Sequence, residues 1–104
     1  MTLPERDTEG FLVNLNDWTP EVGRQMALAD GLDLTDAHWE IIELVRHFYD
    51  ETGVSPVQRV LVKLVRERLG EEKGQSIYLM QLFPGSPARL AARYAGLPKP
   101  ANCL

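Results

Sequence analysis

Hydrophobic residues recur at three- and four-residue steps through most of the chain, which is the spacing of one face of an α-helix. The longest such stretch follows Thr35 and ends near Gly53. Its apolar positions are Trp39, Ile41, Ile42, Val45, Phe48 and Tyr49. A second stretch starts at the Ser55-Pro56 pair and reaches Leu69, and its buried stripe is Val57, Val60, Leu61 and Leu64. The two patterns predict consecutive amphipathic helices that share one core.

Cap and proline signals divide much of the remaining chain. Thr19 precedes Pro20, and Ser86 precedes Pro87, and each pair is typical of a helix start. Ser76 opens a shorter apolar segment that a following Pro-Gly pair must end. These signals predict three further helices, over residues 20–30, 76–83 and 87–95.

Both ends of the chain break the helical period. Residues 3–15 carry a turn signal followed by an apolar run, which predicts a short N-terminal β-hairpin. Residues 97–104, LPKPANCL, contain two prolines and predict an extended, flexible, solvated arm. The expected fold is mainly α, with about five helices and a helix-turn-helix-like core. We expect residues 1–96 to form the helical domain and residues 97–104 to form the arm.

Composition restricts the class of protein. A chain of 104 residues with 44% hydrophobic and 25% charged residues fits one small globular domain. No apolar run is long enough to span a membrane, and the polar, acidic N-terminus has no targeting pattern, so we expect a cytoplasmic protein. The net charge of −4 argues against a general nucleic-acid coat protein.

The single cysteine, Cys103, is the second-last residue. One cysteine excludes an internal disulfide and a multi-cysteine zinc site. Behind Pro98 and Pro100 it is poorly placed for burial, and Lys99 favours its thiolate form. An arm starting at residue 97 could reach about 25 Å from the domain. An incidental exposed thiol is one interpretation. Since no base or oxyanion donor accompanies the cysteine, the other is a thiol that carries a group between the active sites of other proteins.

A basic stripe is predicted on the helix that follows Pro56. Arg59, Lys63 and Arg66 recur at helical spacing within an acidic protein. The stripe is compatible with a solvated face, with a docking patch for an acidic partner or RNA, or with the recognition helix of a DNA-binding protein.

No metal or cofactor site is expected. His38 and His47 are nine residues apart on one helix, so they face opposite sides and cannot hold one metal ion together. His38 is expected to be a surface or packing residue. The glycines lie at predicted helix ends or turns, so they form no phosphate-binding loop.

Five blocks of the sequence are similar to the DsrC/TusE family of sulfur-relay proteins. They are DTEGFL, DWTPEV, LTDAHWEIIELVRHFYDETGVSP, YLMQLFPGSPA and AGLPKPANCL. The resemblance implies the DsrC-like fold. It also implies that Cys103 carries sulfur as a persulfide on the C-terminal arm, with no cofactor.

This sequence differs from part of the family at one position, and that position distinguishes two branches of the family. Members that work with dissimilatory sulfite reductase have a second cysteine eleven positions before the penultimate one, and here that position is Ala92. The resemblance therefore favours the single-cysteine, TusE-like members. It implies a sulfur donor of the TusBCD/DsrEFH type and a tRNA-thiolating acceptor that makes 2-thiouridine at the wobble position. The acceptor, and not this chain, would then bind the tRNA directly. The alternatives are a gamma-type partner of a dissimilatory sulfite reductase or sulfur-oxidation system, and a helix-turn-helix DNA-binding regulator.

Overall fold

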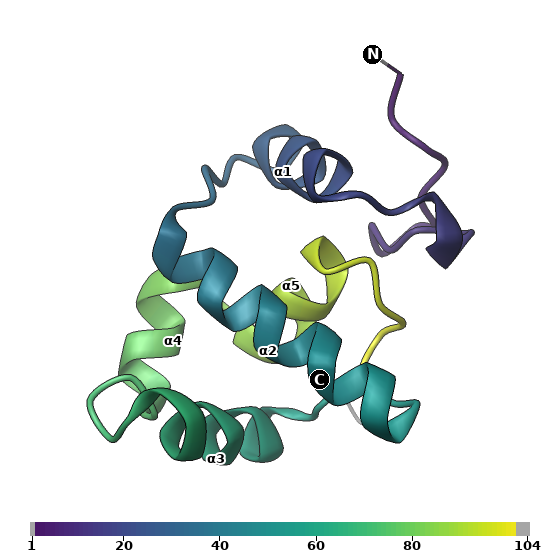
Figure 1. The fold of residues 1–104 in the computed structure, drawn as a ribbon. Helices are drawn as coiled ribbons and strands as arrows, with labels where there is room; N and C mark the ends of the chain where they lie inside the picture. Colours follow the sequence, from purple (N-terminus) through teal and green to yellow (C-terminus); the bar gives the residue numbers. More distant parts are fainter. Residues whose placement is uncertain (1, 102–104) are drawn as a thin grey trace.

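The computed structural model describes residues 2–101, which form a short 3-10 helix and five α-helices (Figure 1). In chain order these are η1 (Leu15–Asp17), α1 (Pro20–Ala29), α2 (Asp36–Thr52), α3 (Gln58–Leu69), α4 (Ser76–Leu82) and α5 (Pro87–Tyr94). The prediction of a mainly helical fold with five α-helices is confirmed. Within this described range, no helix is both long and apolar enough to cross a bilayer.

The predicted starts of α1 and α5 are confirmed, whereas the predicted start of α3 is not. Helix α1 begins at Pro20, and the Thr19 hydroxyl accepts a hydrogen bond from the Val22 N–H at 3.1 Å. Helix α5 begins at Pro87 as expected. Helix α3 instead begins at Gln58, two residues later than predicted. The Ser55 side chain, predicted to cap α3, makes a different contact that is described below.

Helix α5 is the centre of the fold, although it has only eight residues. It packs against each of the other four α-helices, and Figure 1 shows it behind α2, between α1 and α3. Its buried face is mostly alanine, which lets neighbouring backbones come close. The facing core side chains are all at most 1% exposed: Ile41, Ile42, Val45, Leu61, Val65, Leu79 and Phe83. The chain beyond α5 therefore leaves from the middle of the core.

A buried histidine joins α2 to the end of α4. His38 is 6% exposed, and its Nδ1 accepts a hydrogen bond from the Thr35 N–H at 2.9 Å. Its Nε2 lies 2.7 Å from the Leu82 carbonyl oxygen, and because a carbonyl only accepts, Nε2 carries the proton. The ring also meets Phe83 edge-on, with 5.1 Å between the ring centroids. His38 is thus a packing residue, one of the two roles predicted for it.

The predicted N-terminal β-hairpin is wrong. Within the described residues there is no strand, and a single antiparallel bridge joins Arg6 to Leu12. The Asp7 carboxylate accepts hydrogen bonds from the N–H groups of Glu9 and Phe11, at 2.9 and 3.0 Å, which closes a tight turn. A few residues later the chain enters η1, so the ladder has no room to extend.

Candidate functional site at the base of the C-terminal arm

The described part of the arm, residues 97–101, lies against the domain (Figure 1, yellow). Leu97 is 4% exposed, and its N–H donates to the Ala92 carbonyl at 3.0 Å. Pro100 is also buried. The expectation of a solvated arm from residue 97 onward is therefore wrong for Leu97 and Pro100, which bury their apolar surface, whereas Lys99 and Ala101 are exposed as expected. Cys103 lies outside the described residues.

Two polar contacts hold this segment. The Ser55 hydroxyl, in the loop between α2 and α3, donates to the Pro98 carbonyl at 2.6 Å. The Lys99 ammonium lies 2.8 Å from one carboxylate oxygen of Glu9 and 3.2 Å from the other. Ser55 is 7% exposed, whereas Lys99 and Glu9 are both at the surface. The positive charge predicted to favour the Cys103 thiolate is therefore paired with Glu9.

The turn that carries Glu9 is itself fixed to the core by a charged network. Arg6 donates two hydrogen bonds to the Asp30 carboxylate, both at 3.1 Å, and the Tyr94 hydroxyl donates a third at 2.8 Å. Burial alone would raise the pKa of Asp30, but the hydrogen bonds from Arg6 and Tyr94 outweigh it, so its pKa is lowered. Burial, reinforced by the bond to Asp30, raises the pKa of Tyr94 to about 12.

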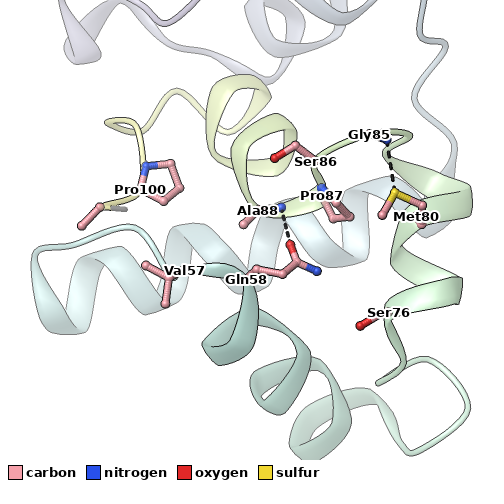
Figure 2. A pocket seen from close by; sticks show the side chains of 10 residues that line it. Val57, Gln58, Ser76, Met80, Gly85, Ser86, Pro87, Ala88 and Pro100 are labelled. Carbon is pink, nitrogen blue, oxygen red and sulfur yellow. Dashed lines mark hydrogen bonds between the residues drawn. The ribbon is translucent and has the colours of Figure 1, made fainter. Parts of the chain in front are cut away.

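A cavity of about 380 Å³ opens where the described arm ends. It lies between the first residues of α3 and α5 and the side of α4, and Figure 2 shows Pro100 at one end and Met80 at the other. Its wall is mainly apolar. The Gln58 side-chain oxygen accepts a hydrogen bond from the Ala88 N–H at 3.0 Å and so caps the start of α5. A pocket of this kind admits a small apolar group next to the arm.

A second hollow lies on another side of the same segment. It measures about 390 Å³ and is lined by Phe48, Gly53, Val54, Ser55, Pro56, Val57, Val60, Pro98, Lys99 and Ala101. Val57 and Ala101 belong to both walls. The described chain therefore ends between two mainly apolar depressions.

The predicted basic stripe lies on one exposed face of α3. Arg59, Lys63 and Arg66 line a groove of about 920 Å³, together with one acidic residue, Glu67, and apolar surface from Val60 and Val62. Arg66 also donates to the Gly74 carbonyl at 3.2 Å, which ties the α3–α4 turn to this face. The structure thus brings the three cations together on the helix that begins beside the arm base.

No three histidine, cysteine or acidic residues within residues 2–101 come together as a metal site. His47 is exposed and pairs with Glu51 on its own helix.

The sequence did not reveal the roles of Ser55, Glu9 and Gln58. Ser55 had the pattern of a helix cap, and nothing local connects Glu9 to a lysine that lies ninety positions away.

Comparisons with known proteins agree with this structure. Residues 2–104 match the family model described as "DsrC like protein". A sulfurtransferase TusE homolog of Haemophilus influenzae is 49% identical over 100 residues, which cover 96% of this chain and 92% of that protein.

Two solved structures have the same fold. The DsrC structure from Allochromatium vinosum superposes with a TM-score of 0.85 and 52% identity, covering 95% of this chain and 88% of that one. The oxidized gamma-subunit of the dissimilatory sulfite reductase (DsrC) from Archaeoglobus fulgidus superposes with a TM-score of 0.84 and is 35% identical in sequence. The match covers 97% of this chain and 92% of that one. By sequence and by fold, this chain belongs to the DsrC family, and it is a sulfurtransferase that serves as a carrier in a sulfur relay.

Proposed function

We propose that Cys103 is the thiol that carries the sulfur, as a persulfide, and that residues 97–104 present it to partner proteins. The observation that carries this proposal is the family match, which extends through residue 104 and includes the only cysteine of the chain. The position of the arm base between two apolar depressions adds support, because a partner protein can bury apolar surface against both of them.

The chemistry is two successive thiol exchanges. The Cys103 thiolate attacks the outer sulfur of a donor persulfide, a new S–S bond forms, and the donor's S–S bond breaks to release the donor thiolate. An acceptor cysteine thiolate then attacks the outer sulfur on Cys103, so that the persulfide moves on and the Cys103 thiolate is restored. Each step conserves the number of S–S bonds and needs no added oxidant or reductant.

We assign the relay to tRNA thiolation in the cytoplasm. The donor is a complex of the TusBCD/DsrEFH type, and the acceptor is a tRNA-thiolating enzyme that makes 2-thiouridine at the wobble position. The TusE relatives support this assignment, and so does Ala92, because alanine at that position excludes a bridge between two cysteines of the chain. The similarity to the gamma-subunit of a dissimilatory sulfite reductase favours a second candidate, a partner role in that system.

The α3 groove is our candidate for partner docking. Its exposed cations, Arg59, Lys63 and Arg66, would face an acidic partner surface, and the apolar side chains between them add buried area. The Arg59→Glu variant should raise the KM of the acceptor enzyme for this chain about tenfold at low salt and leave kcat unchanged. Arg68→Glu is the matched control, since Arg68 is exposed on the same helix but does not line the groove. Equal effects of the two variants would contradict a docking role.

A reconstituted relay tests the proposed function. Radiolabelled cysteine, a cysteine desulfurase, the donor complex, this chain, the acceptor enzyme and tRNA are combined, and label in tRNA is measured. Wild type should support labelling, and Cys103→Ser should abolish it. Labelling that is independent of Cys103 would refute the carrier role. Transfer to dissimilatory sulfite reductase without transfer to tRNA would favour the second candidate.

A further inference from the structure

We propose that Ser55 and Glu9 are positioning residues that latch the base of the arm, so that the chain available to carry the thiol begins at Ala101 rather than at Leu97. The arm latch is defined as two contacts: the Ser55 hydroxyl with the Pro98 carbonyl, and the Glu9 carboxylate with the Lys99 ammonium. The inference rests on the proposed carrier role of Cys103.

Ser55 provides the buried half of the latch. Ser55 is 7% exposed, and its hydroxyl oxygen lies 2.6 Å from the Pro98 carbonyl oxygen. A buried hydroxyl without a partner is unfavourable, so this bond persists unless the segment lifts away as a whole. Helix α3 begins two residues later than its cap signal predicted, in agreement with the use of this side chain for the arm.

Glu9 provides the surface half. An isolated surface ion pair stabilises little, because both side chains must give up conformational freedom. Here the turn is already rigid: the Asp7 carboxylate fixes its backbone, Phe11 is 3% exposed, and Arg6 is bound to Asp30. The Glu9 carboxylate is thus pre-positioned, and it binds Lys99, the residue after Pro98.

The two contacts fix adjacent residues and so determine the reach of the thiol. Two peptide steps separate Ala101 from Cys103, which limits their Cα–Cα distance to about 7 Å. If both latch contacts broke and Pro100 left its buried position, the chain would be free beyond Leu97, and six steps would allow about 20 Å. The volume accessible to the thiol would rise roughly 20-fold, and its local concentration beside the two depressions would fall by the same factor. A latched arm therefore requires donor and acceptor to bring their cysteines to this face of the domain.

Spin labelling tests the latch without any sulfur chemistry. A nitroxide is attached to Cys103, the only cysteine, and the paramagnetic broadening of backbone amides is measured in isotopically labelled protein. In wild type the strongest broadening should fall on cavity-lining residues such as Val57, Gln58 and Ala88. In the Ser55→Ala/Glu9→Gln variant it should fall roughly tenfold at these amides and spread over other faces.

Conservative variants separate positioning from a loss of folding. Ser55→Thr keeps the hydroxyl and should retain the wild-type broadening pattern. Glu5→Gln, a charge-matched change on the same N-terminal segment, should also leave it unchanged, and circular dichroism should confirm that all variants are folded. An identical pattern in wild type and in the double variant would overturn the latch. That result would leave the carrier role standing, whereas failure of sulfur uptake by Cys103 would leave the latch standing.

Discussion

Substitution of Gly96 by alanine should destabilise the protein well beyond the ordinary effect of a helix-ending glycine. Gly96 has a φ of +71°, and a Cβ there would lie closer than 3.0 Å to three carbons of Trp18. Trp18 cannot yield easily: its indole N–H donates to the Tyr94 carbonyl at 2.8 Å, and the Arg46 guanidinium lies 3.8 Å from its ring centroid. The backbone conformation costs about 1–2 kcal/mol for alanine, and forced repacking adds about 1–3 kcal/mol. The free energy of unfolding should therefore fall by about 3 kcal/mol.

Thermal and urea unfolding measure this loss against a matched glycine. Gly53 has a similar φ of +77°, but a Cβ there would meet nothing within 4 Å. Gly53→Ala should lose only the backbone part, about 1–2 kcal/mol. For a domain of this size each kcal/mol lowers the Tm by about 4–8 °C, so the two variants should differ by at least about 4 °C. Equal losses would show that Trp18 does not cover Gly96, and the packing where the arm leaves α5 would then be wrong.

Four further results are expected. Asp30 has a lowered pKa, so its contribution to stability is present above the unfolded pKa, near 3.9, and is lost as pH falls through the lower folded value; Asp30→Asn should flatten this acid limb in urea unfolding. Because the pKa of Tyr94 is raised to about 12, its contribution to the stability of the fold should be lost as pH rises from about 10 to 12, and its absorbance change should occur at a higher pH than that of an exposed tyrosine. His38→Ala should cost about 2–3 kcal/mol in the same unfolding assay, because a helix cap and the partner of a buried carbonyl are lost together. Oxidised Ala92→Cys should become a monomer lighter by about 2 Da, with a disulfide to Cys103, and intermolecular dimers alone would contradict the alignment of position 92 with the second family cysteine.

The sequence predicted the helices well because their signals are local. Prolines at first helical positions, caps such as Thr19 and apolar positions at helical spacing act within a few residues, and they placed all five α-helices. The hairpin failed for a related reason: the turn signal at Asp7 was real, but a ladder needs partners on both sides, and the chain enters η1 soon after Leu12.

The candidate site was less accessible to sequence reasoning because its contacts join distant residues. Ser55 carried the pattern of a helix cap, yet its hydroxyl binds Pro98. Lys99 pairs with Glu9 across almost the whole chain. The two prolines of the arm correctly excluded a helix over residues 97–101, but they could not show that Pro100 would be buried. Periodicity contains no information on such long-range pairs.

The central claim is that Cys103 accepts sulfur, and intact-mass measurement tests it most directly. Wild type and Cys103→Ser are incubated with cysteine, a cysteine desulfurase and the donor relay proteins, and each is weighed before and after reduction. Wild type should gain about 32 Da, one sulfur atom, and a reductant should remove it. The serine variant should gain nothing while its helical circular dichroism stays the same. Sulfur uptake by Cys103→Ser, or no uptake by wild type with competent donors, would contradict the account.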